Sequence, residues 1–161
     1  MKSTTLWHYV IIAASGIAIA VSSCKDDEQQ TVQNRSLYTR LGGTPGITAV
    51  IDTFITFVAA DTVINAFFSG AVADTTGQRI ARLKSMLISQ ICEATGGPCT
   101  YAGLPMSQAH HGMNVQDQHF DALVGDLVKA LDAYSVPATE RNELLAILGP
   151  LRSQIVGQRP G

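Results

Sequence analysis

The chain has 161 residues, and its 11 basic and 13 acidic side chains give a formal net charge of −2. A slightly negative charge without any run of basic residues excludes nucleic acid as the main partner. The mean hydropathy is positive, and part of that value comes from the N-terminal residues.

Residues 1–23 have the pattern of a secretory signal peptide rather than of a fold element. Lys2 supplies a cationic start, and an apolar core follows between Leu6 and Val21. That core is short for a membrane-spanning helix of about 20 residues, which favours cleavage. Val21-Ser22-Ser23-Cys24 resembles the bacterial lipobox, in which the cysteine becomes the lipid-modified N-terminus. The alternative is a signal anchor followed by an ordinary cysteine.

Residues 24–36 are polar and charged with almost nothing to bury, so we expect a flexible tether starting at lipid-modified Cys24. Several acyl chains would anchor the protein firmly to a membrane. We therefore expect an extracytoplasmic protein, lipid-anchored to a bacterial membrane at the periplasmic face or the cell surface. Residues 37–157 remain for one small domain. Its cysteines, Cys92 and Cys99, form either a disulfide or two buried thiols, since the sequence gives no distance between them.

Four amphipathic segments, and no long alternating segment, predict an all-α domain. The first helix is expected to start at Thr44-Pro45, an N-cap followed by proline at the first helical position. Residues 63–70 predict a tight aromatic corner, and residues 71–78 predict a polar linker. The last helix is expected to kink or break at Gly149-Pro150. The four apolar stripes contain Ile47, Val50, Ile51, Phe54 and Val58; Ile80, Leu83, Leu87 and Ile91; Phe120, Leu123, Leu127 and Leu131; and Leu144, Leu148, Leu151 and Ile155.

Residues 95–113 separate the second helix from the third and are rich in helix breakers. Regular helix does not continue through Gly96-Gly97-Pro98 or Leu104-Pro105. Aromatic, sulfur-containing and imidazole side chains are mixed into this segment, which favours a functional loop over disorder. His110 and His111 stand at its end.

Several kinds of chemistry are excluded by motif. The chain has no Cys-x-x-Cys-His for covalent haem attachment, no glycine-rich phosphate loop and no nucleophile elbow. Its cysteines and histidines lack the paired spacing of a structural zinc site. One histidine opposite strongly apolar helix faces suits a flat iron-bearing ligand such as b-type haem. The alternative is that His110 is an ordinary surface or loop histidine.

A series of short motifs in order resembles the group I truncated haemoglobins across nearly all of the expected domain. The resemblance implies the two-over-two helical sandwich of that family, with haem b as the cofactor. The motifs are Leu37-Tyr38-x-Arg40-Leu41-Gly42-Gly43, Ala66-Phe67-Phe68-Ser69-Gly70, Ala94-Thr95-Gly96-Gly97-Pro98, Tyr101-Ala102-Gly103, Ala109-His110-His111-Gly112 and His119-Phe120-Asp121-Ala122-Leu123.

The resemblance also implies a set of haem-binding residues. His110 matches the iron ligand on the proximal side, because Ala109-His110-x-Gly112 distinguishes it from His111. Phe68 matches the phenylalanine that packs on the haem face. Further wall positions are matched by Phe54, Leu83, Leu87, Tyr101, Met106, Val115 and Phe120.

The departures from the family lie on the opposite, distal side of the haem. Ile55 stands where many members have a tyrosine that donates to bound dioxygen, and Leu87 where glutamine is common. Met86 replaces a basic residue that often meets a haem propionate, so Lys84 or Arg82 would have to take that role. Without a donor worth roughly 1.5–3 kcal/mol, dioxygen should bind weakly and autoxidation should be fast. Carbon monoxide and nitric oxide should be affected less.

Three functions remain open from the sequence. The first is reversible binding of dioxygen, nitric oxide or carbon monoxide by a carrier or sensor. The second is a haem enzyme, a nitric oxide dioxygenase or a peroxidase-like scavenger, which needs an unknown redox partner. The third is a haem-free helical lipoprotein, which the presence of His110 and Phe68 argues against.

Overall fold

The computed structural model describes residues 35–158, and all regular structure among them is helical, which confirms the predicted all-α class. The predicted signal peptide and the expected lipid attachment at Cys24 lie outside the described residues. The elements are α2 (Leu37–Arg40), α3 (Gly43–Ala60), α4 (Asn65–Val72), α5 (Gln78–Ala94), α6 (Met106–Ala109), α7 (Asp117–Ala133), α8 (Ala138–Leu148), the 3-10 helix η1 (Gly149–Leu151) and α9 (Arg152–Ile155).

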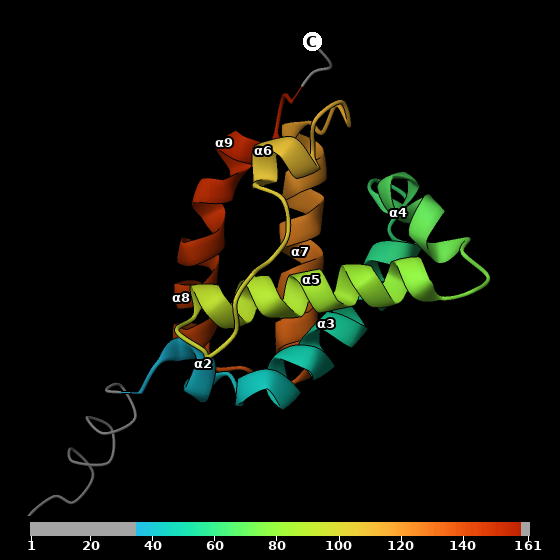
Figure 1. The fold of residues 1–161 in the computed structure, drawn as a ribbon. Coiled ribbons are helices and arrows are strands. Elements are labelled where there is room, and N and C mark those ends of the chain that lie inside the picture. The colour runs from blue at the N-terminus through green and yellow to red at the C-terminus, as the bar shows by residue number, and fades with distance from the viewer. Residues whose placement is uncertain (1–34, 159–161) are drawn as a thin grey trace, which may run out of the picture.

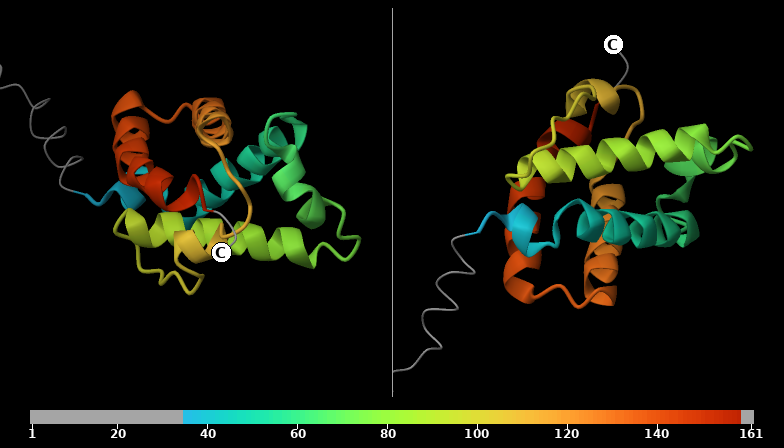
Figure 2. Two further views of the ribbon diagram at one scale, coloured as in Figure 1. Left: turned by 90° about the horizontal axis from the view of Figure 1, so that it is seen from above. Right: turned by 60° about the horizontal axis from the view of Figure 1, so that its bottom comes forward.

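Two pairs of helices cross to form a two-over-two sandwich (Figure 1). α3 and α5 run across the molecule, and α7 and α8 stand against them, an arrangement that Figure 2 shows from two further sides. α3 packs against both α5 and α7, so it is the central element of the core. The buried residues of α3 include Ile55 as well as the predicted stripe, so they cover more than one face of the helix. A helix that is apolar on more than one face can pack against two neighbours.

α3 is long and apolar enough to cross a membrane by length and composition. Its buried side chains nevertheless belong to the main core, where they pack with residues of α5, α7 and α8. Those buried side chains are Ile47, Val50, Ile51, Phe54, Ile55 and Val58. A core helix of this kind is expected to have the same composition as a spanning helix.

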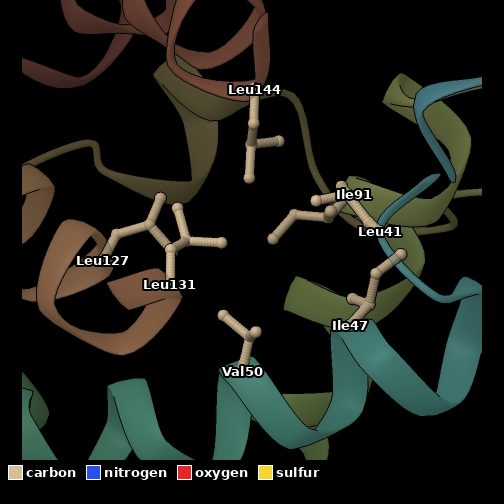
Figure 3. Close-up of a pocket in the computed structure, with 7 residues that line it drawn as sticks. All are labelled: Leu41, Ile47, Val50, Ile91, Leu127, Leu131 and Leu144. Atoms are coloured by element: carbon tan, nitrogen blue, oxygen red, sulfur yellow. The ribbon is translucent and has the colours of Figure 1, made fainter. Parts of the chain in front are cut away.

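The core contains one small apolar void of about 10 Å³ where α3, α5, α7 and α8 meet (Figure 3). That volume is close to the minimum that holds one water molecule, and an apolar void of this size stays dry. Only aliphatic side chains line it, namely Leu41, Ile47, Val50, Ile91, Leu127, Leu131 and Leu144.

The turn from α2 into α3 differs from the prediction that α3 starts at Thr44-Pro45. The helix begins at Gly43, and Gly42 is its N-cap, with φ of 84° for Gly42 and 65° for Gly43. Glycine adopts positive φ without steric penalty. The amide of Thr44 donates to the Tyr38 hydroxyl at 3.1 Å, so a side chain from α2 satisfies an N–H that would otherwise need a cap.

The corner expected over residues 63–70 is the short helix α4, which extends to Val72 and therefore shortens the expected linker. The remaining turn is held by Asp74, whose carboxylate accepts hydrogen bonds from the amides of Thr76 and Arg79. These bonds, that of Arg79 first, lower the pKa of Asp74. The break predicted at Gly149-Pro150 is confirmed, because η1 interrupts the helix there.

Arg40 ties α2 to α8. Its guanidinium lies 3.0 Å from Glu140 Oε1 and also pairs with Glu143. The hydrogen bond to Glu143, followed by that to Glu140, raises the pKa of Arg40. The charged pair fixes the N-terminal end of the described chain against the last helices.

Candidate functional site

A cavity of about 470 Å³ lies between α4, α5, α6 and the start of α7. Its size is in the range of small-molecule and cofactor sites, and its lining is mostly apolar. The apolar residues from α3, α4 and α5 are Phe54, Phe67, Phe68, Ala71, Leu83, Met86 and Leu87, and those from the later part of the chain include Met106, Met113, Val115, Phe120, Leu123 and Ile155.

Most of the site residues predicted from the sequence meet at this one cavity. They come from α3, α4, α5, the connection between α5 and α6, α6 itself and the start of α7, which is why neither periodicity nor spacing alone could assemble them. The predicted residues that line the cavity are Phe54, Phe68, Leu83, Leu87, Tyr101, Met106, His110, Val115 and Phe120.

Ile55 and Lys84, also predicted for the site, are not among the lining residues. Ile55 follows Phe54 on α3 and is turned into the main core, where 9% of its surface is exposed. The ammonium of Lys84 lies 2.7 Å from the carboxylate of Asp52 and so joins α5 to α3. Of the two basic residues considered for the cavity, Arg82 is the one that lines it.

His110 is fixed by the carbonyl of Met106, one turn earlier in the chain. That oxygen accepts a hydrogen bond from the His110 amide at 3.1 Å and another from the ring nitrogen Nδ1 at 2.8 Å. A carbonyl only accepts, so Nδ1 carries the hydrogen, and the lone pair of the neutral ring is on Nε2. The same hydrogen bond orients metal-binding histidines in many proteins. His111 is exposed and does not line the cavity.

Two other polar side chains that line the cavity, Tyr101 and Gln90, are bonded to neighbours. The α5 wall therefore presents few hydrogen-bond donors to the cavity. The hydroxyl of Tyr101 donates to the carbonyl of Leu104 at 3.1 Å. The amide nitrogen Nε2 of Gln90 lies 3.4 Å from the sulfur of Met106. Leu83 and Leu87 are the α5 residues between Arg82 and Gln90 that, with Met86, face the cavity.

His119 is a second histidine of the lining that the sequence did not single out for the site. Its Nδ1 accepts a hydrogen bond from the amide of Gln116 at 3.0 Å, which caps α7. The ring packs edge-on against Phe67, with 4.9 Å between centroids. Leu123 and Ile155 were also missed, although both continue apolar stripes that the periodicity identifies.

Cys92 and Cys99 form a disulfide with 5.7 Å between their Cα atoms, which decides the question that the sequence left open. Cys92 is fully buried on α5, and Cys99 lies in the connection to α6. Gly97 lies between them, and a Cβ there would be 2.6 Å from the sulfur of Cys92. Glycine is therefore needed at this position for close approach, while Gly96 has a φ of 79°.

The residues present fit the haem expected from the sequence. Within residues 35–158, no three His, Cys, Asp or Glu side chains are grouped to hold a metal ion. A single histidine with its Nε2 lone pair available, at the wall of an apolar cavity, matches a metal whose other ligands belong to an organic cofactor. Arg82, exposed at the start of α5, offers a positive charge for the carboxylates of such a cofactor.

Comparison with known proteins gives a consistent result. The family model described as bacterial-like globin matches residues 36–156. The group 1 truncated haemoglobin of Mycolicibacterium paratuberculosis is 34% identical over 126 residues, which cover 78% of this chain and 88% of that protein. The corresponding protein of Synechocystis is 36% identical over 120 residues, 71% of this chain and 90% of the relative.

Solved structures show the same similarity in three dimensions. The Fe(III) form of the truncated haemoglobin from Tetrahymena pyriformis superimposes with a TM-score of 0.69 at 28% identity, covering 76% of this chain and 99% of that one. The group II truncated haemoglobin of Bacillus anthracis has a TM-score of 0.66 at 19% identity, which shows similarity of fold alone.

Proposed function

This chain belongs to the bacterial-like globin family as a truncated haemoglobin, and we propose that it binds diatomic gases reversibly at a haem b held by His110. Haem iron is the cofactor of the protein, and it supplies a position at which dioxygen, nitric oxide or carbon monoxide binds.

The observation that carries the proposal is the bonding of His110. The Met106 carbonyl holds both its amide and its Nδ1, so the ring is oriented and the unprotonated nitrogen is Nε2. His110 lies at the end of α6 and lines the apolar cavity. An oriented imidazole at the wall of an apolar cavity is the protein part of a haem site.

The α5 wall determines which gas is retained. Leu83 and Leu87 offer only aliphatic surface, and the amide of Gln90 is engaged with Met106. Dioxygen depends most on a donor because it becomes partly negative when bound, whereas nitric oxide and carbon monoxide depend on one less. We therefore propose a pocket that holds nitric oxide and carbon monoxide in preference to dioxygen, relative to truncated haemoglobins with polar distal residues.

Arg82 is proposed as the partner of a haem propionate. It lines the cavity and is exposed, so its guanidinium can reach a carboxylate at the rim. Lys84, the other residue considered for this role, is already paired with Asp52.

We also propose that the domain is held outside the cytoplasm by a lipid on Cys24. The lipobox resemblance around Cys24 motivates this proposal. The Cys92–Cys99 disulfide supports an oxidising compartment, because such bonds rarely persist in the cytosol.

Spectroscopy of two neighbouring variants tests the haem site. The full chain, purified with haem, should have a Soret band characteristic of histidine ligation. His110→Ala should lose that ligation and most of its haem, since only His110 of the pair lines the cavity. His111→Ala is the matched control and should keep the wild-type spectrum. An unchanged spectrum in His110→Ala would refute the proposed ligand.

A further inference from the structure

Residues 98–104, the middle of the connection between α5 and α6 (residues 95–105), form a strap along the cavity. Tyr101, Gly103 and Leu104 of the strap line the cavity. The strap runs from the C-terminal end of α5 to α6, where Met106 and His110 stand (Figure 1). Its position therefore determines where the histidine-bearing helix begins.

The strap has few hydrogen bonds, although Tyr101 packs against the cluster of Met106, Val115, Phe120 and Ile155. Among residues 35–158, no backbone-to-backbone hydrogen bond outside the helices involves residues 98–104. The bond from the Tyr101 hydroxyl to the Leu104 carbonyl is internal to the strap. A segment with so few hydrogen bonds is expected at the low-stability end of the molecule.

Two contacts with α5 hold the strap where hydrogen bonds are few, one near each of its ends. Near its start, Cys99 is bonded to Cys92, which is fully buried in the main core. Just beyond its end, the amide of Gln90 contacts the sulfur of Met106 at 3.4 Å. The covalent bond is by far the stronger of the two, because a thioether is a weak acceptor.

From this geometry we infer that the Cys92–Cys99 disulfide positions the haem-binding face. It fixes the strap on α5, the strap places α6, and the Met106 carbonyl in α6 orients His110. The inference rests on the proposed haem site. Opening the disulfide leaves the main core intact and loosens the connection between the α5 wall and His110.

The test begins with the full-length haem protein in its oxidised form, verified by the mass of the Cys92–Cys99-linked peptide. Tris(2-carboxyethyl)phosphine then reduces the bond. The phosphine gives up two electrons and takes an oxygen atom from water, and the two protons of that water complete the thiols of Cys92 and Cys99. The phosphine is removed before the haem measurements, because phosphines and thiols can both bind haem iron.

The first readout is the rate of haem transfer to an excess of apomyoglobin. Reduction should accelerate transfer about tenfold, because the closed loop no longer restrains the strap. The Cys92→Ala/Cys99→Ala variant should transfer haem at the fast rate without phosphine and should not respond to it. The iron–histidine stretching frequency should also shift on reduction, which a change in global stability alone would not cause.

The second readout does not require haem. Hydrogen exchange of the apoprotein should become faster on reduction at the hydrogen-bonded amides of residues 108–111, whereas the amides of α3 and α7 should keep their protection. Unchanged exchange in that segment together with an unchanged transfer rate would overturn the inference. If neither redox state holds haem, the proposed function fails, and the exchange result still decides whether the disulfide restrains the strap. If the double variant does not fold, reduction of the wild-type protein remains the test.

Discussion

At the residue scale, the α5 wall of the cavity accounts for the expected gas preference. Leu83 and Leu87 occupy the cavity side of the helix, with Arg82 at one end and Gln90 at the other. The amide of Gln90 has two N–H donors, and its nitrogen contacts the sulfur of Met106 on α6. The polar side chains on α5 thus lie at the two ends of the cavity wall, and the middle of that wall is apolar.

Replacing Leu87 with glutamine should restore a donor and slow the release of dioxygen. A hydrogen bond to a partly negative ligand contributes about 1.5–3 kcal/mol, so release should become roughly ten to a hundred times slower. Stopped-flow measurement of dioxygen release from the ferrous protein gives this rate directly. The release of carbon monoxide should change much less.

Leu87→Met is the matched control for that substitution, since methionine has a similar length and no donor. It should leave dioxygen release close to the wild-type rate. Equal slowing by glutamine and methionine would mean that packing, and not hydrogen bonding, limits dioxygen retention.

At the element scale, sequence periodicity predicted the helices that bury one clear apolar face. The stripes of Ile47 to Val58 and of Phe120 to Leu131 became α3 and α7 because those faces meet in the core. The start of α3 was predicted incorrectly, since the hydroxyl that receives the Thr44 amide belongs to Tyr38 on another helix. Capping by a tertiary contact leaves no local signal.

The candidate site was predicted from the family resemblance rather than from periodicity. Nine of the residues that the resemblance implies line one cavity in the structure. The resemblance could not show that Ile55 turns into the core or that Lys84 is occupied by Asp52. His119 was missed because it lies beside the apolar stripe, and its contact with Phe67 of α4 leaves no local signal.

The connection between α5 and the strap depends on close packing at Gly97. An alanine Cβ would lie 2.6 Å from the Cys92 sulfur and 2.6 Å from the Tyr38 ring. Both neighbours belong to packed elements, so Gly97→Ala should lower the free energy of unfolding by about 1–3 kcal/mol. Urea denaturation of the oxidised protein measures this change.

Gly125→Ala offers a control within the same chain. Gly125 is inside α7, and nothing lies within 4 Å of the position that an alanine methyl group would take there. Alanine should raise the free energy of unfolding by about 0.5–1 kcal/mol, because glycine is costly in a helix. Destabilisation of similar size at both positions would show that the effect at Gly97 is not one of close packing.

At the scale of the whole molecule, the buried apolar residues form two clusters. The main core joins α3, α5, α7 and α8 and includes Cys92. The second, smaller cluster consists of Met106, Val115, Phe120 and Ile155, three of which come from α6, α7 and α9. All four line the cavity, so this cluster is completed by what the cavity binds, whereas of the buried main-core residues only Phe54 and Ile64 line it.

The disulfide that links the strap to the main core also bears on where the molecule resides. The proposed export and the proposed membrane anchoring should be separable, because Cys92–Cys99 depends on an oxidising compartment and not on Cys24. Cys24→Ala should abolish lipid attachment, because the proposed acyl chains would be joined to this cysteine. Wild-type protein should enter the detergent phase of a Triton X-114 extract. Labelled palmitate should be incorporated into the wild-type protein alone.

Exported Cys24→Ala protein should keep the Cys92–Cys99 bond and the Soret band. Wild-type protein that carries no label and stays in the aqueous phase would refute the lipid anchor.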